Sequence, residues 1–157
     1  MQKIIENLQE ADRIIKMADH LIYMAYPLVQ DKKLLLKILT ETNKAIIKII
    51  SAILQFDYVY KKINLQKDPD TNFEIFKSQC APRYEITDDE LRKVTEIIEL
   101  TKKHQESTME FVRDNKIVIM SGSSGLRMLT ADRVKEFVIV AKVLIKKVEK
   151  VVKEKTY

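Results

Sequence analysis

The sequence predicts an all-α protein: an antiparallel four-helix bundle with a short crossover helix and a small β-hairpin before the last helix. Of four long helical segments, three repeat apolar residues at alternating steps of four and three, the spacing of a helix that packs on one face. Only two glycines and three prolines occur in 157 residues, so few positions interrupt a helix. Because no segment has the composition of a linker, we expect residues 1–157 to form a single domain.

The first two helices are expected to form an antiparallel pair. In residues 2–26, alanines at 11, 18 and 25 lie one heptad apart and allow a partner helix to approach closely. Pro27 should end this helix, because proline lacks an N–H and disfavours helix at the residue before it. Asp31 can cap the next helix, and the short connection predicts antiparallel neighbours.

The second helix, residues 31–62, is apolar over most of its circumference, so several elements must cover it. Beyond its main seam lies a further apolar row of Ile47, Ile50 and Leu54. Either the segment 65–85 or a second copy of the protein can cover this row. Since that segment is short and only partly apolar, we expect the second copy, which makes the row a candidate homodimer interface.

The remaining elements follow from their start and stop signals. Residues 65–85 read as a crossover with a short helix, and Thr87 with Glu90 has capping-box spacing at the start of the third long helix. That helix is expected to run to Arg113. Residues 116–129 then read as a β-hairpin around the glycine turn at 121–125, with a helix continuing through residue 120 as the alternative. Thr130 should cap the last helix.

Several kinds of catalytic site are excluded by the residues present. A di-metal bundle needs two Glu-x-x-His motifs, but His20 and His104 have Met17 and Thr101 three residues before them. One cysteine and two histidines do not suit a zinc site either. The glycine turn lacks phosphate-loop spacing and does not open a helix. We therefore expect no metal and no cofactor.

Polar residues on the first and third helices form a candidate cleft. Asp19 and His20 lie near the end of the first helix, and His104 interrupts the apolar face of the third, which ends at Arg113. If the two helices face each other here, an acid, two imidazoles and a guanidinium converge. The alternatives are a hydrogen-bonded polar layer that sets helix register, or simple exposure to solvent.

The last helix is basic. Residues 130–157 contain eight Lys and Arg residues against four acidic residues. Lys142, Lys146, Lys150 and Lys153 are candidates for contact with nucleic acid or an acidic protein. The alternative is that these lysines only keep an outward helix face in water.

Composition also indicates the compartment. The single cysteine, Cys80, cannot form an intramolecular disulfide, which favours a cytoplasmic protein. No apolar signal region follows Met1, and lysines interrupt every apolar run, so neither secretion nor a membrane span is expected. Abundant Lys and Ile fit an archaeal, AT-rich or thermophilic source.

The alanine-spaced first helix, the Asn43-Lys44-Ala45-Ile46 stretch and Arg113 late in the third helix resemble the HEPN superfamily. This resemblance implies a helical domain associated with RNA or nucleotides, often dimeric. Family ribonucleases carry a histidine four to six residues after that arginine, whereas here Asp114 to Met120 contain none. Glu110 to Arg113, leading into the hairpin, also resemble an uncharacterised archaeal helical family, which implies no activity.

Together these features predict a non-enzymatic bundle that acts through self-association or binding to a protein partner. The alternative is a HEPN-like RNA- or nucleotide-associated domain that uses Arg113 and the basic last helix.

Overall fold

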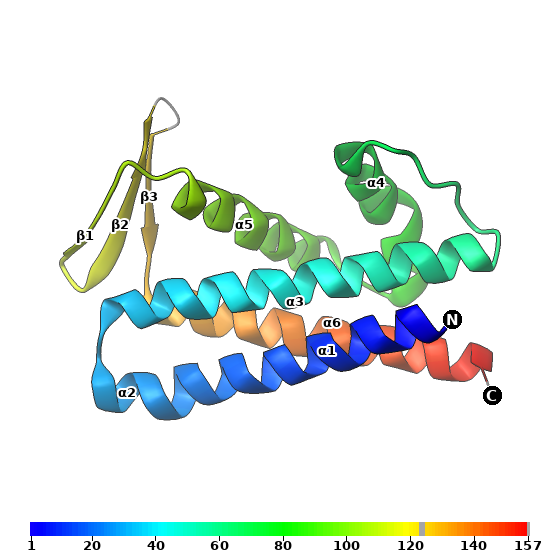
Figure 1. Ribbon diagram of the computed structural model, residues 1–157, viewed down its shortest axis with the longest axis horizontal. Helices are drawn as coiled ribbons and strands as arrows, with labels where there is room; N and C mark the ends of the chain where they lie inside the picture. Colours follow the sequence, from blue (N-terminus) through cyan, green and yellow to red (C-terminus); the bar gives the residue numbers. More distant parts are fainter. Residues whose placement is uncertain (123–124, 157) are drawn as a thin grey trace.

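The computed structural model describes residues 1–122 and 125–156. The chain is mostly helical, with one small antiparallel sheet (Figure 1). The prediction of a helical protein is confirmed at this level. Of the glycine turn expected at 121–125, residues 123 and 124 lie outside the described part.

The first helix continues further than its proline predicts. α1 spans Gln2–His20, a π-helical turn follows at Leu21–Ala25, and α2 spans Tyr26–Val29. Pro27 therefore lies inside the helical segment, at the start of α2, and does not end it. The wider π turn changes the hydrogen-bond pattern just before the proline, where its missing N–H and its ring would otherwise disrupt an α-helix. The segment ends at Gln30, which has a left-handed φ of 54°.

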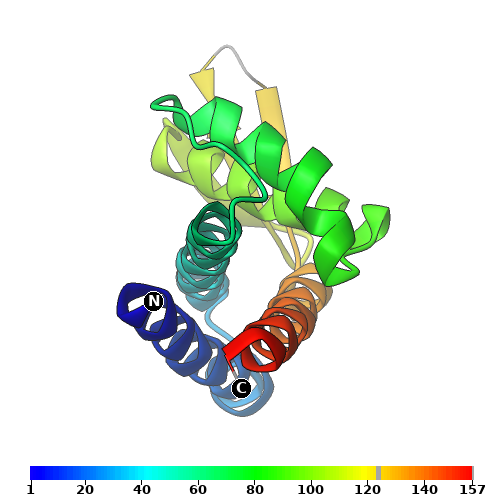
Figure 2. The ribbon, with the colours of Figure 1, turned by 90° about the vertical axis from the view of Figure 1, so that its right-hand side faces the viewer.

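α3, Lys32–Val59, is the central element of the protein. The Asp31 side chain accepts a hydrogen bond from the Lys33 N–H at 3.0 Å, so the predicted cap is present. Side chains such as Ile38, Ile46 and Ile53 are completely buried, because α3 contacts α1, α5 and α6 (Figure 2).

The crossover after α3 consists of α4 (Pro69–Ile75), a π turn (Phe76–Cys80) and a 3₁₀ turn (Ala81–Tyr84). Ile50 and Leu54 are 6% and 9% exposed, and Leu65 and Phe73 of the crossover pack against the core beside them. The chain itself therefore buries most of the row that we expected a second copy to cover. Only Ile47, at 47% exposed, remains open to a partner.

A buried carboxylate fastens the crossover to α3. Asp57, near the end of α3, accepts hydrogen bonds from the Tyr84 hydroxyl at 2.8 Å and from the Arg83 guanidinium at 2.5 Å. Asp57 is only 4% exposed. Because the two bonds join residues 26 and 27 positions apart, they hold the end of the crossover against α3.

α5 spans Asp88–Gln105 and has the predicted capping box between Thr87 and Glu90. It ends eight residues earlier than expected. The residues assigned to its last turns form β1, Met109–Arg113, instead.

The sheet has three strands in the order β1-β2-β3, with β2 at Lys116–Ser121 and β3 at Gly125–Leu129. β2 pairs antiparallel with both neighbours, with Phe111 opposite Val118 and Val118 opposite Met128. The predicted two-strand hairpin therefore omitted β1. This third strand forms because β1 finds a hydrogen-bonding partner in β2, which helical periodicity cannot reveal.

α6, Ala131–Thr156, is capped by the Thr130 hydroxyl, which accepts from the Arg133 N–H at 3.1 Å. Figure 1 shows α1 and α5 running in one direction and α3 and α6 in the other. Seen end on, α1, α3 and α6 form a triangle, and α5 lies on the side of α3 and α6 away from α1 (Figure 2). The sheet is at one end of this assembly and the crossover at the other.

Candidate functional site

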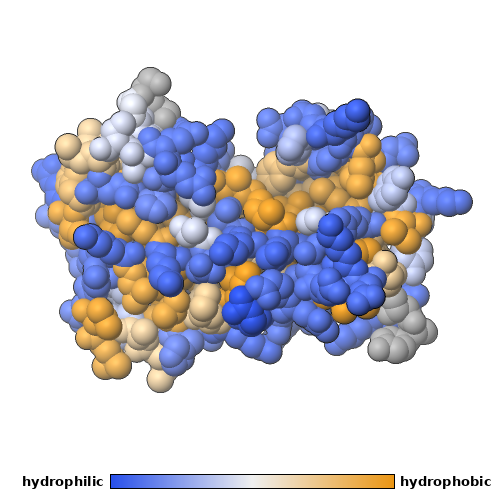
Figure 3. Space-filling view, in the orientation of Figure 1, coloured by the Kyte–Doolittle hydropathy of each residue, from blue (hydrophilic) through white to orange (hydrophobic). Residues whose placement is uncertain are grey.

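The sheet carries an exposed apolar face. The strand register places six apolar side chains on the side away from the helices, and we call them the outer sheet face: Met109, Phe111, Val118, Met120, Leu126 and Met128. Met109, Leu126 and Met128 are 58%, 49% and 52% exposed, whereas Val118 of the central strand is buried, at 3%. Figure 3 shows this apolar surface at the upper left of the molecule, over the sheet.

The opposite side of the same sheet is the buried one. Ile117, Ile119 and Leu129 are between 0% and 2% exposed and belong to the core under α3 and α5. An antiparallel sheet that only covers a core normally turns polar side chains to water, giving alternating apolar and polar residues. Here both faces are apolar, so the outer sheet face has the composition of a contact surface.

Charged residues border the outer sheet face at one end. Arg113 and Lys116 face each other across the β1–β2 turn, where Asp114 and Asn115 have left-handed φ values of 50° and 64°. Asp114 and Asn115 are residue types that tolerate this conformation in a two-residue hairpin. The Arg113 side chain is 76% exposed, and its contact with Asp114 is long, at 4.0 Å.

The predicted polar cleft does not form. His104 Nδ1 lies 2.5 Å from an oxygen of Glu110, a partner that the sequence did not suggest. Asp19 instead pairs with Lys142 of α6, and Arg113 lies at the tip of the sheet. Asp19 and His20 are separated from His104 because α1 and α5 lie on opposite sides of α3 and α6 (Figure 2). His20 is exposed on α1.

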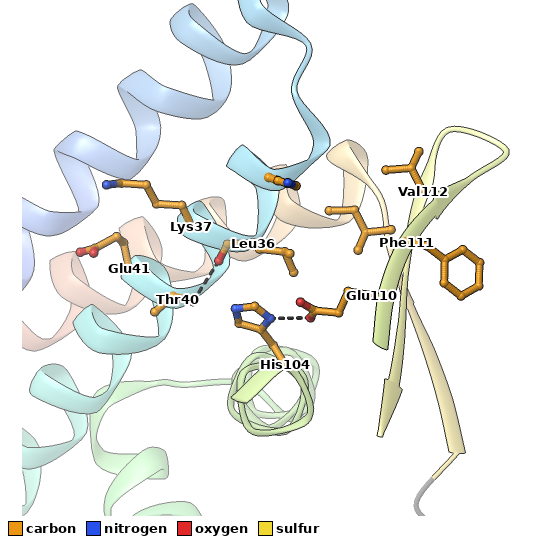
Figure 4. Close-up of a pocket in the computed structure, with 10 residues that line it drawn as sticks. Leu36, Lys37, Thr40, Glu41, His104, Glu110, Phe111 and Val112 are labelled. Atoms are coloured by element: carbon orange, nitrogen blue, oxygen red, sulfur yellow. Dashed lines mark hydrogen bonds and ion pairs between the residues drawn. The ribbon is translucent and has the colours of Figure 1, made fainter. Parts of the chain in front are cut away.

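His104 and Glu110 lie in a cleft between α3, the end of α5 and β1 (Figure 4). We call it the His104 cleft. The two side chains point toward each other between α5 and β1, next to Leu36 and Thr40 of α3. The volume of the cleft is 470 Å³. The sequence analysis missed Glu110 as the partner of His104. This pairing can be recognised only once residues 109–113 are known to form a strand.

The lysines of α6 do not form a free basic surface as a set. Lys142 is neutralised by Asp19 and also lies 5.5 Å from the ring centre of Tyr23. Lys146, Lys150 and Lys153 are exposed. At steps of four and three they lie on the same side of α6 as Lys142.

The one cysteine is a structural group. Burial, and after it the neighbouring Asp57 carboxylate, raise the pKa of the Cys80 thiol to about 12. A thiol that stays protonated and enclosed is a poor nucleophile. Cys80 belongs with Asp57, Arg83 and Tyr84 in the attachment of the crossover, and carries no chemistry of its own.

Over residues 1–122 and 125–156, no three His, Cys, Asp or Glu side chains converge in a way that would hold a metal ion. In the same part of the chain, none of the helices is both long enough and apolar enough to cross a membrane. Comparison with protein-family models and with curated proteins finds no match to this chain.

Proposed function

We propose that this protein is a non-enzymatic interaction module that forms a homodimer through its outer sheet face. The observation that carries this proposal is a sheet with apolar residues on both sides. Those opposite the helices are mostly exposed in the single chain, while Ile117, Ile119 and Leu129 on the other side are buried. The proposal keeps the mode of action expected from the sequence, but moves the interface from the row Ile47, Ile50 and Leu54 on α3 to the sheet.

A second copy suits this surface for geometric reasons. Two identical sheets can pack face to face about 10 Å apart, and a two-fold axis makes the same patch serve both partners. A two-fold axis also lets Arg113 and Lys116 of one copy lie away from those of the other, because they border only one end of the face. Three methionines adapt easily to such a contact because their side chains are flexible.

Light scattering after size exclusion tests the proposal at micromolar protein concentrations. We expect the wild-type mass to be that of a dimer, and the Met128→Lys variant to be a monomer. A lysine near the centre of a well-packed interface weakens it by roughly 2 kcal/mol or more. The matched control is Ile47→Lys, which places the same charge on a residue of similar exposure, 47% against 52%.

Two outcomes contradict the proposal. A strictly monomeric wild-type protein would remove the dimer altogether. A dimer that survives Met128→Lys but is lost in Ile47→Lys would return the interface to α3. Circular dichroism of each variant shows whether the helical fold is intact.

A HEPN-like, RNA- or nucleotide-associated domain is the second candidate function, and the exposed lysines of α6 favour it. Arg113, the residue that the resemblance requires late in the third helix, lies in β1, so the support comes from Lys146 and Lys150. Binding should weaken steeply with salt and fall on charge reversal at these two lysines. A single-stranded RNA oligonucleotide that fails to bind even at low salt would exclude this function.

We also propose that α1, α3, α5 and α6 constitute an up-down-up-down four-helix bundle, flattened so that α3 and α6 meet across its short diagonal. Support comes from the alternating helix directions (Figure 1) and from the contacts of α3 and α6 with both α1 and α5. A cytoplasmic location is proposed on the single cysteine, Cys80.

A further inference from the structure

The His104 cleft has the size and lining of a small-molecule site. Its volume of 470 Å³ lies within the range of about 300–1,000 Å³ typical of ligand pockets. Leu36, Val112 and Ile117 provide apolar wall, from α3, β1 and β2. Glu110 lines the cleft on the same side as Val112, whereas Phe111 points away from His104 and belongs to the outer sheet face (Figure 4).

One ring nitrogen of His104 remains for a ligand. Nδ1 is held by Glu110, and the second ring nitrogen lies on the side of Thr40 and α3 (Figure 4). The Thr40 hydroxyl itself donates to the Leu36 carbonyl oxygen at 2.9 Å, so it does not compete for the ring. Pockets that bind small molecules combine apolar walls with a few such fixed polar atoms.

The charges that remain unpaired around the cleft are positive. The Glu110 carboxylate contacts His104, and Glu41 contacts Lys44 at 3.6 Å. Lys33 and Lys37 both line the cleft, and within the described residues neither ammonium group makes an ion pair. Their alkyl chains can cover apolar surface while the charged ends reach the mouth of the cleft.

We propose that the His104 cleft binds an amphipathic monoanion. Its apolar body lies against Leu36, Val112 and Ile117, and its anionic head contacts Lys33 and Lys37. This site is independent of the dimer interface, because the residues that hold the ligand lie on the helix-facing side of the sheet or on α3 and α5.

The experiment uses the full chain and decanoate, below its micelle-forming concentration, in isothermal titration calorimetry. We expect one decanoate per chain and binding at least tenfold weaker in the double variant Lys33→Glu/Lys37→Glu. The matched control is Lys146→Glu/Lys150→Glu, which makes the same change of charge on exposed residues of α6 and should leave affinity unchanged. Decanol, which lacks the anionic head, should bind at least tenfold more weakly than decanoate.

A second variant tests the cleft without altering charge. Val112 is 56% exposed, so Val112→Trp can place an indole into the cleft with little effect on the core, and it should abolish binding. Nuclear magnetic resonance of the His104 ring should show shifts on adding decanoate to the wild type but not to Val112→Trp.

Several results would overturn the proposal. The first is the absence of both binding heat and His104 ring shifts. The second is a decanoate affinity of Lys33→Glu/Lys37→Glu equal to that of the wild type, and the third is an affinity for decanol equal to that for decanoate. Loss of decanoate binding in Met128→Lys would place the probe on the outer sheet face instead. A dimer that fails to form does not bear on these readouts, so the two proposals fail separately.

Discussion

At the scale of single residues, Asp57 connects parts of the chain that no local pattern relates. It is an almost completely buried carboxylate near the end of α3, and its two oxygens accept from Arg83 and Tyr84 of the crossover. A buried charge is tolerated only when it is paired and hydrogen bonded. The Asp57 contacts therefore decide how the crossover lies on α3, and with it which side chains of α3 remain exposed.

The same cluster predicts how stability depends on pH. Burial, together with Asp57, raises the pKa of Cys80 from 9.0 to about 12 and raises the pKa of Tyr84 as well. Above pH 9 the unfolded chain releases the Cys80 proton while the folded chain keeps it, so the unfolded state binds fewer protons. The free energy of unfolding should therefore fall as pH rises from about 9 toward 12.

Urea unfolding at pH 8 and at pH 10.5 measures this difference. Cys80→Ala should lower stability at both values but flatten the dependence on pH, because the titrating thiol is gone. Tyr84→Phe separates the contribution of the phenol. A wild-type stability that stays level or rises between these pH values would show that Cys80 is not enclosed in solution.

At the scale of elements, the start of α5 is determined locally and then tied to α6. Thr87 and Glu90 exchange hydrogen bonds in the capping box, and Lys147 of α6 contacts the Glu90 carboxylate at 2.7 Å. Lys147 also donates to the carbonyl oxygen of Glu85. The cap therefore contributes both to α5 itself and to its attachment to α6.

We expect Thr87→Ala to lower the free energy of unfolding by about 1 kcal/mol, because a helix donor loses its partner. Thr87→Ser keeps the hydroxyl and should retain most of the stability. The control is Thr95→Ala: Thr95 lies within α5 and its hydroxyl only bonds back to Leu91, so its loss should change stability little. Denaturant unfolding of the three variants decides the comparison, and an equal loss in both alanine variants would contradict it.

The element that sequence reasoning misassigned is β1. Phe111 and Val112 continue the apolar residues of the third helix closely enough to predict a helix to Arg113, yet α5 ends at Gln105. Met109, Phe111, Met128 and Leu126 follow the period of two that marks strands, a signal that five-residue segments carry only weakly. Strand formation depends on β2, which is a partner outside the segment itself.

At the scale of the whole molecule, the arrangement of the long helices separates polar residues that we expected from the sequence to share one cleft. α1 and α5 lie on opposite sides of α3 and α6, so Asp19 meets Lys142 and His104 meets Glu110. The same arrangement places the sheet at one end of the long helices with most of its apolar outer face exposed. That face, rather than Ile47 of the second helix, is the surface on which we propose that a second copy packs.

The proposed dimerisation through that face predicts that thermal stability depends on protein concentration. Because only folded chains can form the dimer, the melting temperature of the wild type should rise as protein concentration increases. The Met128→Lys variant should melt at one temperature throughout the range, whereas Ile47→Lys should behave as the wild type. Differential scanning calorimetry at several concentrations measures this, and a wild-type melting temperature independent of concentration would argue against the dimer.

The sequence by itself determined the helices and their caps. Apolar spacing placed α1, α3, α5 and α6, and the short-range signals at Asp31, Thr87 and Thr130 marked where three of them begin, because cap and helix lie within a few residues. Only the tertiary structure decided that β1 is a strand, that Ile50 and Leu54 are covered by the crossover, and that His104 faces Glu110. Each of these depends on contacts between separate segments of the chain, or on the direction that the chain takes between α5 and β1. Periodicity cannot reveal either, because it describes one segment at a time.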